Sequence, residues 1–200
     1  MIMRKIAVYG GSFDPPHKGH LHLARNLAEK CGAEKVIIIP TSLSPFKNSS
    51  GADAEDRLNM CRLAFADSLF EVSDIEIKRG GKSYTVDTLN DIKRAYKDSE
   101  LFLFMGDDML LSFDKWYKYQ DILNIATLVC ACRKDKENLL VQMRSFAENV
   151  LKLPKDGILF CEAEPLEISS TDIRGGSDDL KKQFLVSEVY DYILEKGLYK

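Results

Sequence analysis

A chain of 200 residues that is 45% hydrophobic and 30% charged can bury a full core, and we expect one domain over residues 1–200. Its net charge of −3, from 28 basic and 31 acidic residues, argues against a nucleic-acid partner, because such partners usually require a basic surface. There is no cationic leader and no apolar run of about 18 residues, so we expect a soluble cytoplasmic protein with no membrane partner.

The first predicted elements are a strand and a helix joined by a glycine-rich turn. Residues 6–9 predict a buried strand, and the apolar positions of residues 21–31 fall on one face of a helix. The turn carries His17 and His20 where the helix begins. A helix start presents unpaired N–H groups and the positive end of the dipole, and a glycine such as Gly11 lets backbone approach a ligand closely. The turn therefore predicts a site for the phosphates of a nucleoside triphosphate.

The rest of the chain alternates between strands and helices, which are marked by β-branched runs and by helical spacing of apolar residues. In chain order the predicted elements are a strand at 35–39, a polar loop at 41–52, a helix capped by Asp53, one or two strands at 70–77, a helix at 85–96, a strand at 101–105, a strand at 127–132, a helix at 139–150, a strand at 158–161, a helix opening at 168–174 and a last helix around 189–194.

This alternation predicts an α/β fold, a Rossmann-like parallel sheet with helices on both faces, as a single domain with a small C-terminal helical part. In such sheets, ligands bind beyond the carboxyl ends of the strands. Four polar or glycine-rich segments fall at that edge, namely residues 10–20, 41–51 and 106–108 and the turn before Ser169.

The five cysteines, at positions 31, 61, 130, 132 and 161, follow no metal-ligand spacing. Two of them, Cys130 and Cys132, alternate within an apolar run. We therefore expect buried free thiols in a reducing compartment.

All three histidines lie within six residues. A single histidine is more often structural, and His22, which lies off the turn, keeps that interpretation. Clustering at a helix start favours ligand binding for His17 and His20. A zinc ion is the alternative for a histidine pair, with Asp14 as the nearby third ligand. The sequence has neither a Walker motif nor G-x-G-x-x-G, which disfavours kinase-type and dinucleotide sites.

Two motifs resemble those of the nucleotidylyltransferase superfamily. Residues 11–20, Gly-Ser-Phe-Asp-Pro-Pro-His-Lys-Gly-His, are similar to its H-x-G-H element, and residues 168–174, Ile-Ser-Ser-Thr-Asp-Ile-Arg, to its I-S-S-T-x-I-R element. Residues 82–89, and residues 106–108 followed by Trp116, narrow the resemblance to the nicotinate-nucleotide adenylyltransferases. The resemblance spans nearly the whole chain. It implies transfer of AMP from ATP to nicotinate mononucleotide, giving deamido-NAD and pyrophosphate in NAD biosynthesis.

The resemblance also implies which residues act. His17 and His20 are expected to bind the ATP phosphates and the transition state, with Lys47 and Arg174 on the β and γ phosphates. Mg²⁺ is expected to be bound through the phosphates of ATP rather than by protein ligands. The other expected ATP-binding residues are Gly10, Gly11, Ser12, Phe13, Gly106, Asp108, Ser170, Thr171 and Ile173. The mononucleotide is expected to contact Tyr84, Thr85, Trp116 and Arg133.

Several of these residues have structural alternatives. Ser170, Thr171 and Asp108 could serve as helix caps, and Trp116 could fill the core. The sequence also departs from the family twice. It has Ser44-Pro45-Phe46-Lys47 where the family has Pro-Pro-His and a basic residue, so the loop histidine is absent while Lys47 keeps the charge. It has Arg133-Lys134-Asp135 where the family tends toward Arg-Pro-Gly.

The implied reaction needs no general base, because the attacking phosphate oxygen is already ionised at pH 7. Positioning and electrostatics can carry such an in-line displacement without a covalent intermediate. Two alternatives remain open. One is a sister transferase acting on nicotinamide mononucleotide or on phosphopantetheine, the latter disfavoured by residues 83–89 and Trp116. The other is a nucleotide-binding sensor without turnover, which would not need all four of His17, His20, Lys47 and Arg174.

Overall fold

A computed structural model describes residues 3–42, 51–133, 137–163, 166 and 168–199. The chain divides into two compact units. Unit 1 comprises Met1–Tyr9, Leu23–Val36 and Tyr84–Pro165, and unit 2 comprises Gly10–His22, Ile37–Ser83 and Leu166–Lys200. The single domain over residues 1–200 stays a prediction.

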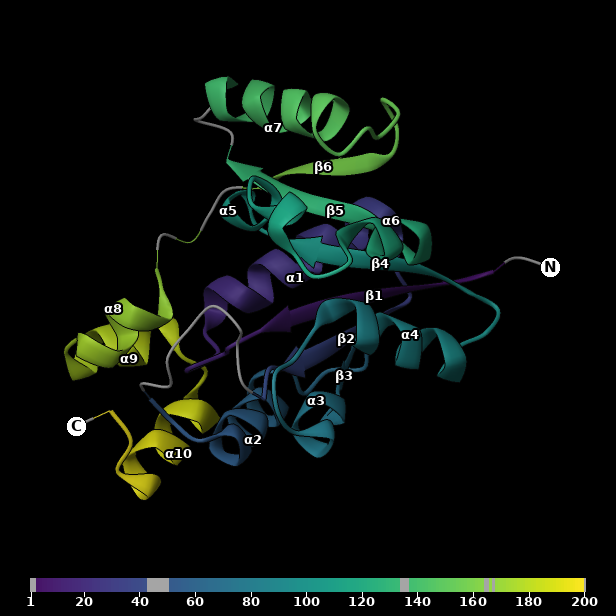
Figure 1. The fold of residues 1–200 in the computed structure, drawn as a ribbon. Coiled ribbons are helices and arrows are strands. Elements are labelled where there is room, and N and C mark those ends of the chain that lie inside the picture. The colour runs from purple at the N-terminus through teal and green to yellow at the C-terminus, as the bar shows by residue number, and fades with distance from the viewer. Residues whose placement is uncertain (1–2, 43–50, 134–136, 164–165, 167, 200) are drawn as a thin grey trace. The chain divides into compact units, whose positions relative to one another are not determined.

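The strands form one sheet in the order β3-β2-β1-β4-β5-β6, and the described pairs β1–β4, β4–β5 and β5–β6 are parallel (Figure 1). The predicted parallel α/β sheet is thus confirmed. The strands are β1 (Arg4–Gly11), β2 (Lys35–Pro40), β3 (Phe70–Val72), β4 (Ser99–Met105), β5 (Ala126–Arg133) and β6 (Ile158–Ala163). The helices are α1 (Lys18–Cys31), α2 (Ala54–Ala64), α3 (Ile75–Arg79), α4 (Thr85–Ala95), α5 (Asp107–Leu110), the 3₁₀ turn η1 (Phe113–Lys115), α6 (Tyr119–Ile125), α7 (Glu137–Asn149), α8 (Ser170–Gly175), α9 (Asp178–Phe184) and α10 (Ser187–Lys196).

Unit 1 is built on buried, almost continuously apolar strands. Every residue of β4 from Leu101 to Met105 is buried, as expected of a parallel strand covered on both sides. Because β4, β5 and β6 run in parallel, their carboxyl ends lie at one edge of the sheet, where Gly106 follows β4 directly. The cysteines are free and buried, as predicted, and burial raises the pKa of the Cys61 and Cys130 thiols.

Unit 2 carries the small C-terminal helical part. Helices α8, α9 and α10 follow one another, and α10 packs against α2 (Figure 1). At that contact the hydroxyl of Tyr192 donates to Asp56 Oδ1 over 2.8 Å and accepts from Asn59 Nδ2 over 3.3 Å. Gly197, with φ +64°, ends α10 in the left-handed conformation typical of a helix C-terminus.

One local prediction differs from the structure, and some short helices, α9 among them, were not predicted. Residues 75–79 form helix α3 rather than a strand, because the ion pair from Lys78 to Asp74 has helical spacing and Gly80, at φ +67°, ends the turn. Helix α9 has no buried residue, so no apolar stripe marks it in the sequence. Among the described residues, no helix combines the length and apolarity needed to cross a bilayer.

Candidate active site

The loop after β1 is organised around the buried ring of Phe13. Phe13 has φ 47° and is 1% exposed, and its ring meets the rings of His20 at 5.1 Å and Phe65 at 5.8 Å edge to face. A Cβ on Gly11 would lie 3.1 Å from this ring, so the glycine leaves room for it. At Gly10 a Cβ would meet nothing within 4 Å. The contact with the Phe13 ring is therefore enough to explain why residue 11 is a glycine, without a close approach of its backbone to a phosphate.

His17 and His20 form a closely packed pair of tilted rings at the start of α1. Their ring centroids lie 3.8 Å apart with an angle of 34° between the planes. His17 is 5% exposed, and burial lowers its pKa from 6.5 to about 4, an effect that the carboxylate of Asp172 partly opposes. His17 is therefore a neutral imidazole at pH 7, able to donate one hydrogen bond and accept another.

The contacts of the two rings indicate which nitrogen carries each proton. The backbone N–H of His17 donates to His20 Nδ1 over 3.2 Å, so this nitrogen is an acceptor and the His20 proton lies on Nε2. His17 Nδ1 is buried and has no hydrogen-bond partner among the described residues. A buried donor without an acceptor is rarer than an unused acceptor, so we place the His17 proton on Nε2 as well. Both rings then donate through Nε2.

Gly19, between the two histidines, is required by the His17 ring. A Cβ at residue 19 would lie 2.9 Å from His17 Nδ1 and 3.3 Å from Ile168 Cγ2, closer than side chains pack without moving. The H-x-G-H spacing thus combines two imidazoles in contact with each other and the small residue that lets the first of them lie against the helix.

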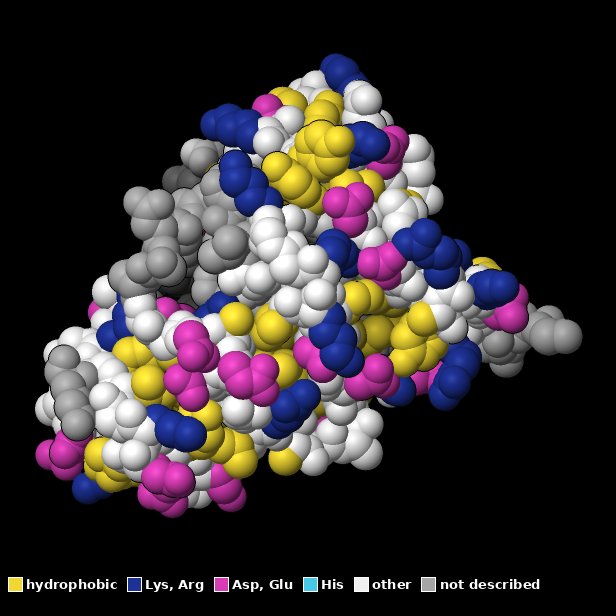
Figure 2. All heavy atoms as spheres, turned by 60° about the horizontal axis from the view of Figure 1, so that its bottom comes forward, with side chains coloured by type: hydrophobic (Ala, Val, Ile, Leu, Met, Phe, Trp, Pro, Cys, Tyr) yellow, Lys and Arg dark blue, Asp and Glu magenta, His cyan; other side chains and the backbone are white. Residues whose placement is uncertain are grey.

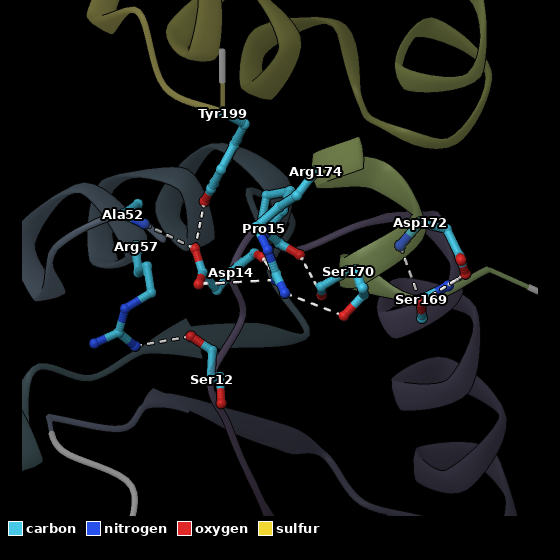
Figure 3. A network of polar contacts seen from close by, with 11 residues as sticks. Ser12, Asp14, Pro15, Ala52, Arg57, Ser169, Ser170, Asp172, Arg174 and Tyr199 are labelled. Carbon is cyan, nitrogen blue, oxygen red and sulfur yellow. Dashed lines mark hydrogen bonds and ion pairs between the residues drawn. The ribbon is translucent and has the colours of Figure 1, made fainter. Parts of the chain in front are cut away.

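Asp14 is the hub of a polar network that joins this loop to α8 and to residue 199 (Figure 3). Its Oδ1 accepts from the backbone N–H of Ala52 over 3.0 Å and from the hydroxyl of Tyr199 over 2.6 Å. Its Oδ2 lies 3.9 Å from Arg174 Nη1, which also donates to the Asp14 carbonyl over 2.6 Å. A Cβ on Gly51 would lie 1.9 Å from Oδ2, so residue 51 must be glycine for this approach.

Arg57, on α2, joins the loops that follow β1 and β2. Its guanidinium is buried and donates to the carbonyl of Ser12 over 2.8 Å and to that of Thr41 over 2.7 Å (Figure 3 shows the Ser12 contact). Sequence reasoning did not select Arg57. The available signal was a cation at helical spacing from Ala54 and Cys61, on the face of the helix that is otherwise apolar.

Helix α8 is held against the same loop. Its cap is Ser169, whose side chain accepts from the N–H of Asp172 while the Asp172 carboxylate accepts from the N–H of Ser169, a capping box. The Ser169 hydroxyl also donates to Asp172 Oδ2 over 2.6 Å, and this bond, together with the one from the Ser169 N–H, lowers the pKa of Asp172. The alternative that Ser170 or Thr171 caps the helix is therefore wrong. Ser170 Oγ instead donates to the carbonyl of Pro15 over 2.9 Å.

The remaining predicted residues of α8 have distinct environments. Thr171 Oγ1 accepts from Arg174 Nη2 over 3.1 Å, so the guanidinium is held on two sides. Ile173 is fully buried, which leaves only its backbone as a candidate ligand contact. Unit 2 thus brings the histidine pair, Ser170, Thr171 and Arg174 together around residues 12–17.

Unit 1 holds a second group of predicted residues. Gly106 follows β4 and is the N-cap of α5, so Asp108 is not the cap; its side chain is exposed. Trp116 is partly exposed and packs on the buried ring of Phe113 at 5.1 Å, so it is not simply core filler. Tyr84 lies 4.7 Å from the ring of Tyr117. Thr85 is the first residue of α4.

Two predicted residues cannot be placed in this way. Lys47, with Phe46, lies outside the described residues. Arg133 is the last residue of β5, and its side chain is not among those described.

No group of three or more metal-ligating side chains gathers among the described residues. On the face shown in Figure 2, lysine and arginine side chains are interspersed with aspartates and glutamates rather than gathered in one basic area. That mixed charge fits a protein whose ligands are small molecules.

Comparison with known proteins gives a consistent result. A family model described as cytidylyltransferase-like matches residues 8–176. The chain is 39% identical over 168 residues to a probable nicotinate-nucleotide adenylyltransferase of Aquifex aeolicus, covering 82% of this chain and 98% of that one. It is 36% identical to a protein of the same description from Neisseria meningitidis serogroup A, covering 99% and 100%. The fold matches the Plasmodium falciparum nicotinic acid mononucleotide adenylyltransferase complexed with NaAD, with a TM-score of 0.72, 15% identity, and 98% and 97% of the chains covered.

Proposed function

The chain belongs to the cytidylyltransferase-like family, and we propose that it is an adenylyltransferase that moves AMP from ATP to nicotinate mononucleotide, giving deamido-NAD and pyrophosphate. One observation carries this proposal. The His17–His20 pair and the Arg174 guanidinium both contact the loop formed by residues 12–17. That arrangement presents two imidazole donors and a cation at the start of a helix, which suits a polyphosphate.

The reaction requires that the two substrates be positioned and that negative charge be stabilised, and it requires no proton transfer. The phosphate of the mononucleotide is already ionised, so it attacks the α-phosphorus of ATP directly and pyrophosphate leaves. His17 and His20 donate through Nε2 to phosphate oxygens, where negative charge grows as the bond to pyrophosphate breaks. A neutral His17 serves as such a donor without first losing a proton.

Arg174 binds the β and γ phosphates in this proposal. Its bonds to the Asp14 carbonyl and to Thr171 use two of its five N–H groups, which leaves donors for the phosphates in a side chain that is already oriented. Lys47 adds a second cation. The other ATP contacts assigned in unit 2 are Gly10, Gly11, Ser12, Ser170, Thr171 and the backbone of Phe13 and Ile173. In unit 1, Gly106 and Asp108 are assigned by the resemblance to contacts with the nucleotide.

The described residues fit a magnesium ion held by the substrate. Mg²⁺ prefers oxygen ligands, keeps several of its waters and commonly binds through substrate phosphates. In this proposal the phosphates of ATP would supply most of its ligands. The ion would neutralise charge on the leaving pyrophosphate.

For the mononucleotide, we assign Trp116 to stacking on the pyridine ring, with Tyr84 and Thr85 beside that ring, and Arg133 as a further contact with this substrate. The partly exposed indole of Trp116 rests on buried Phe113, so a flat aromatic face is held in place. Such a face suits stacking on a pyridine ring.

The test is pyrophosphate release from ATP and Mg²⁺, with nicotinate mononucleotide and nicotinamide mononucleotide run in parallel. Faster release with the acid is the expected result. Equal rates would show a dual-specificity enzyme and refute the assigned selectivity. Binding of ATP without release with either substrate would refute the transferase and favour a sensor or an enzyme acting on phosphopantetheine.

The variant His17→Ala then tests the mechanism. Loss of one preorganised donor to the transition state should lower kcat about 10²- to 10³-fold. His22→Ala is the matched control, since His22 lies in α1, five residues after His17, and outside the proposed machinery. If His17→Ala and His22→Ala had equal activity, His17 would have no role in the reaction.

A further inference from the structure

We propose that Tyr199 is a positioning residue for ATP, acting through Asp14 on Arg174; this inference rests on the proposed function. Neither the motifs nor the resemblance assigns it such a role. The chain turns at Gly197 after α10, and Figure 3 shows the Tyr199 side chain pointing at the Asp14 carboxylate. The hydroxyl donates to Asp14 Oδ1 over 2.6 Å.

The two oxygens of the Asp14 carboxylate have different partners. Tyr199 and the N–H of Ala52 both donate to Oδ1, which leaves Oδ2 directed at Arg174 Nη1. The Asp14 side chain is 14% exposed and that of Arg174 is 27% exposed, so water screens their interaction only in part. The orientation of this carboxylate therefore influences where the guanidinium rests.

The Tyr199 hydroxyl restrains the Asp14 carboxylate, which would otherwise compete with ATP for the N–H groups of Arg174. A carboxylate near a triphosphate repels it, and a carboxylate that rotates onto Arg174 in a bidentate pair takes up the N–H groups intended for phosphate. With Oδ1 engaged by two donors, the Asp14 carboxylate offers a single long contact of 3.9 Å to the guanidinium, which is anchored by the Asp14 carbonyl instead. Arg174 stays anchored but keeps donors for ATP.

Tyr199→Phe removes the hydroxyl and keeps the ring. We expect kcat to fall about tenfold and the KM for ATP to rise about threefold, as for the loss of one hydrogen bond to a charged group, while the KM for the mononucleotide stays unchanged. A variant that was merely less stable would lose active protein and leave both KM values as they were.

Tyr192→Phe is the matched control. Its hydroxyl makes the same kind of contact, a hydrogen bond of 2.8 Å to the carboxylate of Asp56, within the same unit. It should keep the kinetic constants of the wild-type protein. A thermal unfolding curve for each variant sets the assay temperature below both transitions.

A double-mutant cycle tests whether Tyr199 works through Asp14. If it does, Tyr199→Phe should have little further effect in an Asp14→Asn background, because the carboxylate that it restrains is gone. Additive effects of the two substitutions, or unchanged constants for Tyr199→Phe alone, would overturn the inference.

A readout independent of turnover separates this inference from the proposed function. Hydrogen exchange at the Ala52 amide should be faster in Tyr199→Phe than in the wild-type protein and unchanged in Tyr192→Phe, because Ala52 donates to the same Asp14 oxygen. If the wild-type protein released no pyrophosphate, the proposed function would fail. Exchange at Ala52 and the affinity for ATP would then decide the role of Tyr199, and unchanged values of both would refute it.

Discussion

Arg57 donates from Nη1 to the carbonyl of Ser12 over 2.8 Å, although the two residues are 45 positions apart in the chain. The same guanidinium reaches the carbonyls of Thr41 and Ser42, so one buried cation determines where two loops of unit 2 begin. We predict that Arg57→Met destabilises the protein by about 3 kcal/mol, because three partly buried carbonyls lose their donor at once. Urea unfolding measures this change.

Arg62→Met is the control for that experiment. Arg62 lies on the same helix, and its side chain is 50% exposed, so its replacement should change stability by less than about 0.5 kcal/mol. Equal losses for the two variants would show that the Arg57 contacts are not what stabilises the loops.

Gly19→Ala should separate activity from stability. The new Cβ would lie 2.9 Å from His17 Nδ1 and force the imidazole to move, so we expect kcat/KM to fall about 10²-fold. Alanine is favoured over glycine within a helix by about 1 kcal/mol, so α1 should not lose stability to the same extent.

Gly175→Ala provides the comparison, because a Cβ at that helical position would meet nothing within 4 Å. Its activity should match that of the wild-type protein. Steady-state kinetics and thermal unfolding of both variants test the prediction, and a fully active Gly19→Ala enzyme would contradict it.

His17 makes a predictable contribution to the pH dependence of stability. Its pKa is lowered from 6.5 to about 4 on folding, so the unfolded chain takes up this proton at a higher pH than the folded chain does. The contribution is fully present above pH 6.5 and is lost as the pH falls from 6.5 toward 4. Between pH 7 and pH 5 the loss is about 2 kcal/mol.

His17→Asn should lack this component, and His22→Asn should keep it. Free energies of unfolding at pH 7, 6 and 5 are to be compared among the three proteins, so that other titrating groups cancel. Parallel profiles for the wild-type protein and His17→Asn would show that burial does not hold His17 neutral.

Trp116 gives a direct signal for the mononucleotide, since it is the one tryptophan in the sequence. If the pyridine ring stacks on the indole, nicotinate mononucleotide should quench the fluorescence in a saturable way, and Trp116→Phe should bind it several-fold more weakly. ATP alone, in the absence of mononucleotide, is the control. Quenching by ATP alone would show that Trp116 contacts ATP rather than the mononucleotide.

Much of the fold could be predicted, because the apolar runs in the sequence coincide with strands that are buried in the tertiary structure. The apolar runs at 101–105 and 127–132 have no alternative to burial in a parallel sheet, and both lie within strands, β4 and β5. Residues 75–77 were ambiguous, because three residues of alternating character fit a strand as well as a helix. Helix α9 buries nothing, so it left no periodic signal.

The chemical character of the site was also visible in the sequence. The spacing of His17, Gly19 and His20 places two imidazoles at one helix start whatever the rest of the fold, because the distance along a helix follows from residue number. Long-range contacts are different. The pairing of Tyr199 with Asp14, 185 residues away, and the reach of Arg57 to Ser12 have no local pattern and arise only when separate elements pack.

The sequence by itself therefore determined the parallel α/β architecture, the turn between β1 and α1 and the identity of its two histidines, all of which depend on short-range periodicity and spacing. The tertiary structure decided the protonation of His17, the cap of α8 and the orientation of Arg174. Burial and hydrogen-bond partners set each of these, and both are properties of the packed chain rather than of any one segment.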